Sequence, residues 1–575
     1  MRPTGRGWSR PGRPSTCGNA WARLHLMAIS SILHRPAASR PARPSGRRPR
    51  PPRLQGPRGR RLRRGTCAMC KTPLCCAVLL AVLLLFTANP SATAATYYVA
   101  PQGDDSSPGT EAQPWKMLQK AAAAVQPGDT VRIRAGEHFV GAGLNVTRAG
   151  TADRPITYQA YGDGEVRITN STSLPSGAWT HVKGSIYSTP ISRPALCVFQ
   201  NDTPLYFSGN PIKISSVEEM IANSSYKSGT TLYVWLEDGS DPKNSAMRVS
   251  PGNAINLSDC HHNVFDGLTV EYGYTAFKVQ RDTTHHITIR DCRLRSIGNQ
   301  GIQPVARDCV IENNLFQKIG SNKHQHGIYG SQPRTIVRHN VFEEMAGCGI
   351  HQFHQGDPPA GGGCEFYGNV FRRPLRMTIP ATPSSKIYYY VDIVASGEGD
   401  NKIYNNVFYG EGKRSGVHLS SGGNRIYHNT FVDCASAIQF KTGNTGNHVI
   451  NNIFQDAART FLDWPSGALP QTLDYNLYYN ASAAPQWERD GVAHKTFTAY
   501  QQASGETHSL YADPRLLGAA DARPRPGSPA VDAGVALKDV PADFSGMARP
   551  QGGACDIGAY EHRPEAPDPG PARDK

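Results

Sequence analysis

Residues 326–351 read HGIYGSQPRTIVRHNVFEEMAGCGIH, and this stretch holds one complete unit of a repeat that continues on both sides. Similar segments recur between residues 260 and 455, as NVFDGLTV, ITIRDCRL, VIENNLF, IVRHNVF, EFYGNVF, KIYNNVF, RIYHNTF and HVINNIF. They align on Leu268, Cys292, Asn314, Asn340, Asn369, Asn406, Asn429 and Asn452, in steps of 24, 22, 26, 29, 37, 23 and 23 residues. A period in the low twenties, in short alternating segments rich in Val, Ile and Phe, predicts a solenoid of β-strands.

Two columns of this alignment are apolar and are expected to point inward. Two residues after the aligned position come Val270, Leu294, Phe316, Phe342, Phe371, Phe408, Phe431 and Phe454. Three residues before it come Phe265, Ile289, Ile311, Val337, Phe366, Ile403, Ile426 and Val449. Parallel coils stack about 4.8 Å apart, so these columns predict continuous apolar ladders. The Asn column predicts an internal ladder of amides at a turn.

The repeats resemble right-handed parallel β-helix proteins of the pectin lyase-like superfamily, over most of residues 96–455. The opening TYYVAPQGDDSSPGTEAQPWKMLQKAAAAVQPGDTVRIRAG resembles secreted β-helix proteins that include pectate lyases of polysaccharide lyase family nine. The resemblance implies an all-β, single-stranded right-handed parallel β-helix and raises the expectation of lyase chemistry. It transfers no residues, because the compact cluster of calcium-binding Asp residues typical of pectate lyases has no match here.

The domain organisation follows from changes in composition along the chain. The helical spacing of Trp115, Leu118, Ala121 and Val125 predicts a helix that caps the open end of the solenoid. The predicted parts are a basic Arg/Pro-rich leader that fits a mis-called start (1–68), a signal peptide (69–94), an N-terminal cap with the first coils (95–178), a small β insert (179–250), the central parallel β-helix (251–460), C-terminal coils and a cap (461–562), and a disordered tail (563–575).

Residues 69–94 have the three parts of a secretory signal: a basic start at Lys71, an apolar run over 74–86 and a small-residue cleavage site at 92–94. We therefore expect a secreted or cell-surface protein, with no membrane insertion after cleavage. The chain carries a net charge of +15, but residues 95–575 hold 43 Lys and Arg against 46 Asp and Glu. This balance gives no electrostatic reason to expect nucleic acid as a partner. We expect a monomer.

Eight of the 13 cysteines follow the signal segment, and none of these forms a CxxC pair. Export permits disulfides. The spacing nevertheless favours buried small side chains, with one or two bridges at most, over a disulfide framework or a zinc site.

A further strand in each repeat offers an outward-facing column of polar residues. It starts with a small residue, an apolar one and then a polar one, as in Gly327-Ile328-Tyr329 and Gly349-Ile350-His351. Since side chains alternate along a strand, the apolar residue points inward and the next one outward. The predicted outward column is Lys278, Gln303, Tyr329, His351, Asp392, His418 and Gln439, and a second position adds Gln280, Ser331, Ser420 and Lys441. The alternative is a polar face without any task.

Long insertions on either side of Asn369 are expected to wall this column. They contribute Arg372, Arg373 and Arg376, whose guanidinium groups suit the carboxylates of an anionic substrate. Tyr389, within the run Tyr388–Tyr390, could stack on a sugar ring, although one or more of these tyrosines is expected in the core.

The outward column suits β-elimination from a uronic acid polymer better than glycoside hydrolysis. Hydrolysis normally needs two carboxylates, and the column offers Asp392, with Asp357 and Glu398 as loop candidates. Elimination needs a base for the C5 proton, a positive charge on the sugar carboxylate and an acid for the leaving oxygen. These requirements predict a lyase acting on an acidic polysaccharide. A glycosidase, a uronate epimerase and a non-catalytic carbohydrate-binding or structural protein remain alternatives.

Roles within this hypothesis follow from residue type and position. The base is Lys278, His351 or Tyr329, with His351 preferred because it is nearest the insertions. His418 or Tyr329 is the acid. Substrate-binding residues are Arg372, Arg373, Arg376, Gln303, Gln439 and Tyr389. Asp392 either binds Ca²⁺ or orients a histidine.

Two other groups of residues invite a metal interpretation. His324-x-His326 and His351-x-x-His354 have no carboxylate or Cys at a usual spacing to complete a zinc site, so we expect none there. Scattered carboxylates near the C-terminus could hold a structural Ca²⁺, but the expected role of this segment is a final coil or cap. They are Asp532, Asp543, Asp556 and Glu561.

Overall fold

The computed structural model describes residues 93–207, 212–280, 283–304, 306–330, 333–353, 362–375, 389–394, 399–465, 467–468, 470, 472–481, 484 and 486–563. The predicted leader, nearly all of the predicted signal peptide and the tail after Arg563 lie outside these residues. Among the residues described, no helix combines the length and the hydropathy needed to cross a membrane.

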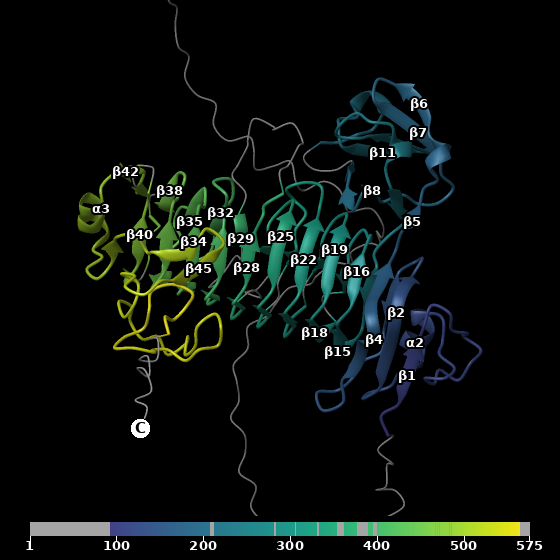
Figure 1. Cartoon of the computed structure of the whole chain (residues 1–575), viewed down its shortest axis with the longest axis horizontal. Helices are drawn as coiled ribbons and strands as arrows, with labels where there is room; N and C mark the ends of the chain where they lie inside the picture. The colour runs from purple at the N-terminus through teal and green to yellow at the C-terminus, as the bar shows by residue number, and fades with distance from the viewer. Residues whose placement is uncertain are drawn as a thin grey trace, which may run out of the picture. The chain divides into compact units, whose positions relative to one another are not determined.

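The chain forms the expected parallel β-helix, with three strands in each regular coil (Figure 1). First strands are β15 (His261–Asp266), β18 (His285–Arg290), β21 (Val310–Glu312), β24 (Ile336–Arg338), β27 (Glu365–Tyr367), β30 (Lys402–Tyr404), β33 (Arg425–Tyr427), β36 (His448–Ile450) and β39 (Thr472–Asp474). Second strands are β16 (Thr269–Glu271), β19 (Arg293–Ile297), β22 (Leu315–Ile319), β25 (Val341–Met345), β28 (Val370–Arg372), β31 (Val407–Tyr409), β34 (Thr430–Val432), β37 (Ile453–Gln455), β40 (Leu477–Tyr479) and β43 (Leu510–Tyr511).

The third strands form a separate sheet, which we call the third-strand sheet. Its members are β3 (Leu144–Val146), β14 (Ile255–Leu257), β17 (Phe277–Val279), β20 (Ile302–Gln303), β23 (Ile328–Tyr329), β26 (Ile350–Phe353), β29 (Tyr389–Val394), β32 (Ser415–Leu419), β35 (Ser436–Phe440), β38 (Thr460–Trp464), β41 (Trp487–Arg489) and β42 (Val492–His494). All pairings are parallel until β42, which runs antiparallel to β41. The repeat therefore sets the register of this sheet coil by coil.

The predicted aromatic ladder is present in the core. Successive rings from Phe316 to Phe454 stack with centroids 4.6 to 5.2 Å apart, and Tyr478 continues the stack at 5.0 Å. Offset stacking of this kind adds to the energy of burial.

The predicted asparagine ladder is also present. Asn406 accepts two hydrogen bonds at its Oδ1, from the backbone N–H and the side-chain amide of Asn369, both at 3.0 Å. The same pattern runs from Asn314 to Asn476. A second buried ladder, Asn401–Asn424–Asn447, lies at another corner and was not predicted. Buried amides are thus satisfied by the coils above and below.

The cysteines are buried small side chains of the core, which is the role that the sequence favoured. All eight that follow the signal segment are buried, and none of these described residues forms a disulfide. Cys292 occupies the asparagine column and donates its backbone N–H to Asn314 Oδ1 at 2.9 Å.

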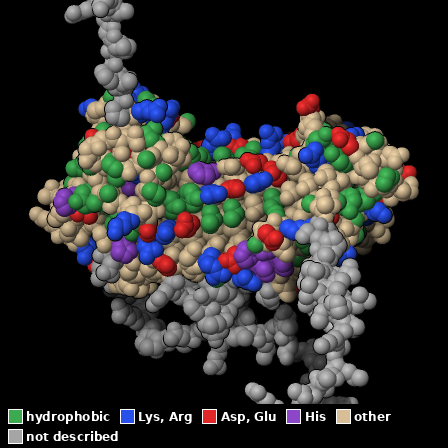
Figure 2. Space-filling model, turned by 90° about the horizontal axis from the view of Figure 1, so that it is seen from below, with side chains coloured by type: hydrophobic (Ala, Val, Ile, Leu, Met, Phe, Trp, Pro, Cys, Tyr) green, Lys and Arg blue, Asp and Glu red, His purple; other side chains and the backbone are tan. Residues whose placement is uncertain are grey.

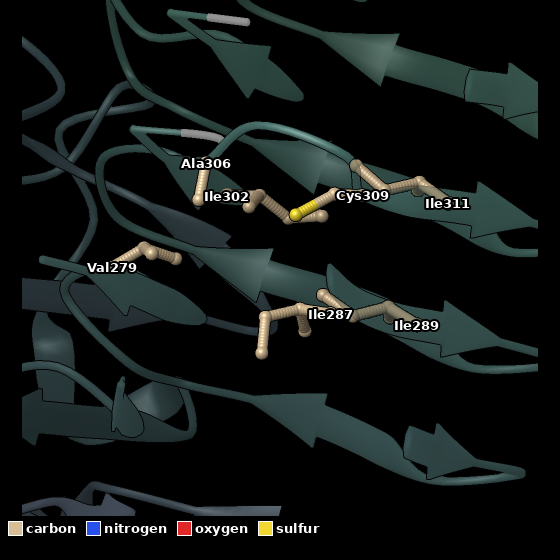
Figure 3. A pocket seen from close by; sticks show the side chains of 7 residues that line it. All are labelled: Val279, Ile287, Ile289, Ile302, Ala306, Cys309 and Ile311. Carbon is tan, nitrogen blue, oxygen red and sulfur yellow. The ribbon is translucent and has the colours of Figure 1, made fainter. Parts of the chain in front are cut away.

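A small apolar cavity lies inside the early coils (Figure 3). Its volume is about 10 Å³, and it is lined by Val279, Ile287, Ile289, Ile302, Ala306, Cys309 and Ile311. An apolar space at the lower limit for one water molecule is a packing defect of the core and not a substrate site.

The N-terminal part matches its prediction, with a shorter helix. Helix α2 (Leu118–Ala124) packs Leu118, Ala121 and Ala122 against the core of the first coils. Those coils contain β1 (Thr96–Val99), β2 (Thr130–Phe139) and β4 (Ile156–Thr169).

The β insert is present as two small sheets with their own apolar clusters, and its first strand lies before the predicted start at residue 179. Its strands are β5 (Thr172–Ser173), β6 (Thr180–Lys183), β7 (Ile186–Pro190), β8 (Cys197–Gln200), β9 (Thr203–Pro204), β10 (Tyr206–Phe207), β11 (Ser224–Ser228), β12 (Thr231–Trp235) and β13 (Met247–Ser250). Short 3₁₀ helices are η1 (Ser176–Ala178), η2 (Val217–Glu219) and η3 (Pro242–Asn244).

The C-terminal part continues the coils, as predicted, and ends them with a helix, but the final segment, which was expected to be a coil or cap, lies along the side of the coils. Helix α3 (Phe497–Ser504) packs its Tyr500 on Trp487 of β41, with ring centroids 4.7 Å apart. The chain then passes through β44 (Leu516–Gly518) and β45 (Asp521–Pro524). The segment that follows returns along the side of the coils, where Val540 packs with Tyr404 and Tyr427. It covers apolar side chains that point out of the first strands.

Candidate functional site

The outward column forms as predicted on the third-strand sheet. In the strand pairings Lys278 is opposite Gln303, and Tyr329 is opposite His351. His351 is in turn opposite Asp392, and Asp392 is opposite His418. The column then continues through Gln439, Asp463 and Glu488. Asp463 and Glu488 were missed because the repeat weakens after residue 455.

Four side chains form a chain of contacts at the centre of this column. His326 Nε2 is 3.0 Å from His351 Nδ1. His351 Nε2 is 3.7 Å from Asp392 Oδ2, and His418 Nδ1 is 2.8 Å from Asp392 Oδ1. We call His326, His351, Asp392 and His418 the histidine–aspartate chain. His326 comes from the turn before β23, so column reasoning alone did not include it.

The hydrogen bonds assign the protons along this chain. The backbone N–H of Cys348 donates to His326 Nδ1 at 2.9 Å, so the neutral His326 ring carries its proton on Nε2. That proton is donated to His351 Nδ1, which places the proton of His351 on Nε2, facing Asp392. The lone pair of His351, on Nδ1, therefore accepts the hydrogen bond from His326 and is not available to take a proton from a substrate. This arrangement disfavours His351 as the base, the role the sequence preferred for it.

His418 has the geometry that a general base requires. Its Nδ1–H donates to Asp392, so its Nε2 carries the lone pair. The ring of Tyr389 stacks on the His418 ring, with centroids 4.5 Å apart and planes 17° apart. The His418 side chain is 22% exposed, against 15% for Asp392. A carboxylate and an aromatic ring thus hold this imidazole in one orientation while it remains open to solvent.

Burial determines the protonation of the inner histidines. Burial lowers the pKa of His326 well below its usual value, and the charges of His351, His324 and Arg414 lower it further. Burial also lowers the pKa of His351, although Asp392 opposes this shift. Burial and Asp392 raise the pKa of Tyr389 to about 12. Both inner imidazoles and the phenol are therefore neutral near pH 7.

Other predicted members of the column lie further from His418. Tyr329 contacts the inner histidines, with its ring centroid 5.4 Å from that of His326 and 5.3 Å from that of His351. It is nevertheless three coils from His418, or roughly 14 Å along the sheet. The exposed Lys278 is two coils further away. Neither residue can act on the same sugar atom as His418.

Two of the three predicted clamp residues, Arg372 and Arg373, do not face this column, which is a correction. Arg372 ends the second strand β28, and its Nε donates to Glu343 Oε2 at 3.1 Å. Arg373 pairs with the same carboxylate. Both guanidinium groups serve a buried Glu343 on another face of the coils. Arg376 lies outside the described residues, as do Ser331, His354, Asp357, Tyr388 and Glu398.

Lys441 is a cation on the coil that follows His418. Lys441 is exposed, and its backbone N–H donates to Leu419 O, the carbonyl next to His418. It directly follows β35, whose Gln439 is opposite His418 in the strand pairing. On the same strand the amide of Gln439 donates to Asp463 Oδ2 at 2.7 Å. Lys441 is thus one candidate to meet a substrate carboxylate near His418; the exposed Arg459 is another, since its charge acts on Tyr389, whose ring stacks on His418.

The geometry favours the orienting role of Asp392 over Ca²⁺ binding. Both of its oxygens face imidazole nitrogens, whereas Ca²⁺ prefers six to eight oxygen ligands. A group formed by His326, Cys348 and His351 has metal-ligand spacing. However, His326 already uses one nitrogen for the backbone N–H of Cys348 and the other for His351.

The C-terminal carboxylates close turns. Asp532, Asp543 and Asp556 accept hydrogen bonds from backbone N–H groups, and Glu561 pairs with the buried Arg549. Each of these four carboxylates therefore has a hydrogen-bond or ion-pair partner within the chain.

Comparison with known proteins agrees with the fold. Residues 97–332 match the family model described as Pel9A-like, right handed beta helix region, and residues 279–454 match the model described as right handed beta helix region. The solved structure of XylC in complex with xylose covers 81% of this chain and 99% of its own, at 13% identity and a TM-score of 0.51.

Curated relatives match over shorter stretches. The uncharacterized protein YwoF of Bacillus subtilis is 30% identical over 168 residues, which is 28% of this chain and 32% of that protein. Pectate lyase PEL9 of Emericella nidulans is 34% identical over 86 residues, which is 15% of this chain and 21% of that enzyme. The matched stretches thus span about a third or less of these relatives.

Proposed function

We propose that this chain, a right-handed β-helix repeat protein, is a secreted polysaccharide lyase that cleaves an acidic polysaccharide by β-elimination. The observation that carries the proposal is the His418–Asp392 hydrogen bond on an open sheet face. The pectate lyase among the relatives and the xylose bound to XylC support carbohydrate as the ligand class. The signal-like segment at 69–94 supports secretion.

The reaction begins with proton abstraction by His418. Its Nε2 takes the C5 proton of a uronate, and Asp392 stabilises the imidazolium that forms. As the electron pair of the C5–H bond forms the C4=C5 double bond, the C4–O bond breaks. The imidazolium then returns a proton to the leaving oxygen, so one residue serves as base and acid. Tyr329, at three coils, is too far away to be that acid.

Lys441 supplies the positive charge in this scheme. A cation beside the uronate carboxylate makes the C5 proton more acidic and stabilises the developing enolate. Lys441 directly follows β35, the strand next to that of His418, and its side chain is exposed. His351 holds Asp392 from the other side.

The experiment that tests this proposal is ultraviolet absorbance of the unsaturated uronide product. The chain from Ala95 onward is incubated with pectate, alginate, hyaluronan, chondroitin and heparin-type polymers, beside its His418→Ala variant. We expect absorbance to rise on one polymer with the unsubstituted chain alone. No rise on any polymer contradicts the proposal, as does an equal rise with the variant.

A glycoside hydrolase is the second candidate, because the structure adds carboxylates to the column. Asp463 and Glu488 are opposite each other on adjacent coils, about 4.8 Å apart along the sheet. Retaining glycosidases hold their two carboxyl groups about 5 Å apart. Release of reducing sugar without ultraviolet absorbance, lost in Glu488→Gln, would favour this candidate. An epimerase would instead exchange solvent deuterium into the C5 position without cleavage, and binding without turnover would indicate a carbohydrate-binding protein.

A further inference from the structure

Two histidine pairs lie at the same position of successive coils. His261-His262 begins β15 and His285-His286 begins β18, and His261 is opposite His285 in the strand pairing. The pairs are 24 residues apart, the same step that separates Leu268 from Cys292 in the repeat. The fold therefore stacks four imidazoles at one corner of the β-helix. This corner lies between the third-strand sheet and the first strands.

The rings of the two pairs are in contact. The His261 and His285 rings are parallel within 1°, with centroids 4.7 Å apart, and the centroids of His262 and His286 are 4.6 Å apart. His262 and His286 both have left-handed backbones, with φ of 52° and 53°, so their side chains leave the corner in the same direction. Figure 2 shows histidine side chains at several places on one face, the largest group beside Lys, Arg, Asp and Glu side chains.

Three of these imidazoles converge on a common point. One ring nitrogen from each of His262, His285 and His286 lies within 4.8 Å of the other two. The Nδ1 atoms of His285 and His286 are 2.7 Å apart. Two nitrogens on a tetrahedral ion with bonds of 2.0–2.1 Å are separated by about 3.3 Å. The 2.7 Å contact is a hydrogen bond and is shorter than this separation, so the exposed His286 ring must turn away from His285 when an ion binds.

We propose that His262, His285 and His286 bind one divalent transition metal ion of the kind that prefers imidazole, such as Zn²⁺, Ni²⁺ or Cu²⁺. Three neutral imidazoles suit these ions and not Ca²⁺ or Mg²⁺, which prefer oxygen. The nearby Asp308 carboxylate already accepts a hydrogen bond from Arg334 Nη2 at 2.8 Å. We therefore expect water, and not Asp308, to supply the remaining ligands of the ion. The ion links two coils through side chains 24 residues apart.

The metal site is separate from the histidine–aspartate chain. Its ligands begin first strands, whereas His351, Asp392 and His418 lie on third strands of later coils. The proposal therefore does not depend on lyase activity. Its consequence is for stability, because an ion that binds the folded chain and not the unfolded chain raises the free energy of unfolding.

The test is metal binding by the purified chain without a histidine tag. Isothermal titration with Zn²⁺ is compared for the unsubstituted chain, His262→Ala, His286→Ala and the control His339→Ala. His339 is an exposed histidine with a similar φ of 54°, but it belongs to another corner. We expect one equivalent of Zn²⁺ to bind, with affinity at least tenfold weaker in both cluster variants and unchanged in the control. Zn²⁺ should also raise the unfolding temperature of the control and not that of His286→Ala.

Paramagnetic resonance with Cu²⁺ provides a second readout. We expect hyperfine structure from coordinated nitrogen in the control, and fewer coupled nitrogens in His286→Ala. Zn²⁺ affinity that is unchanged in the His262→Ala/His286→Ala double variant would overturn the proposal. Binding lost in His351→Ala but kept in that double variant would place the ion on the other histidine group and would equally overturn it.

Discussion

His418 and Asp392 lie on adjacent coils and are joined by a 2.8 Å hydrogen bond from Nδ1 to Oδ1. This one contact fixes the tautomer of an imidazole that is open to solvent on an otherwise polar strand face. It distinguishes the column from a merely hydrated surface, because the carboxylate is itself held between two imidazoles.

Replacing Asp392 by Asn should lower kcat by about 10²–10⁴ without unfolding the chain. The amide cannot stabilise the imidazolium, and its NH₂ group favours the tautomer with the lone pair on Nδ1. Steady-state kinetics and a melting curve measure both effects. Full activity at unchanged stability would show that His418 works without its partner.

Replacing Lys441 by Ala should reduce kcat/KM on the acidic polymer by roughly 10–100-fold, because the substrate carboxylate loses its counter-charge. The matched control is Arg372→Ala, which removes a cation that pairs with Glu343. Kinetics at low and moderate salt separate the two variants. A larger loss of kcat/KM in Arg372→Ala than in Lys441→Ala would instead support the substrate-binding role that the sequence predicts for the arginines.

Chelation should leave the elimination reaction unchanged while lowering the unfolding temperature. Neither His418 nor Asp392 needs an ion in the proposed scheme, whereas the histidine corner holds one. Activity and melting curves with and without a chelator test this separation. Loss of activity that Ca²⁺ restores would show a calcium requirement instead.

Asn406→Ala should destabilise the chain by about 2–4 kcal/mol. The substitution leaves the backbone N–H and the side-chain amide of Asn369 without an acceptor in the core. Asn256→Ala is the control, since Asn256 lies on the outer side of β14. Denaturant unfolding measures the free energy of unfolding of both variants. Equal free energies for Asn406→Ala and Asn256→Ala would show that the asparagine ladder does not stabilise the chain.

Glu506→Gln should stabilise the chain at pH 8 and have little effect at pH 4.5. Burial raises the pKa of Glu506 from 4.5 to about 7, so the folded chain holds a proton that the unfolded chain has released. Stability therefore falls as pH rises from about 4.5 to 7 and is lowest above that range. The glutamine variant removes this loss. Unfolding temperatures across the pH range check the prediction, and parallel curves for the two chains would refute it.

The fold was predictable because one repeat specifies it many times. The Phe and Asn columns have a fixed place in each unit, and the alternation of strands determines which residues face outward. The same logic placed Tyr329, His351, Asp392 and His418 in one column. It could also have placed Arg372 on another face, because Arg372 directly follows the inward Phe371 on a second strand.

Roles within the column were less predictable, because they depend on contacts from turns. The position of His351 in the column suggested that it was the base. However, the ring of His326, which comes from a turn, hydrogen-bonds to His351 Nδ1 and so determines which His351 nitrogen carries the proton. The four-histidine corner was missed because its residues precede the aligned columns. Its signal in the sequence is the repeat of the dipeptide HH at the coil spacing of 24 residues.

The most direct test of the central claim compares His418→Ala with His351→Ala on the polymer that the unsubstituted chain cleaves. The rate of ultraviolet absorbance increase is measured for both variants at matched folded concentrations. If His418 is the base, His418→Ala loses at least about 10³-fold in rate, whereas His351→Ala loses less than about 10²-fold. An inactive His351→Ala beside a His418→Ala variant that keeps a tenth of the rate would contradict the account and return the role of base to His351.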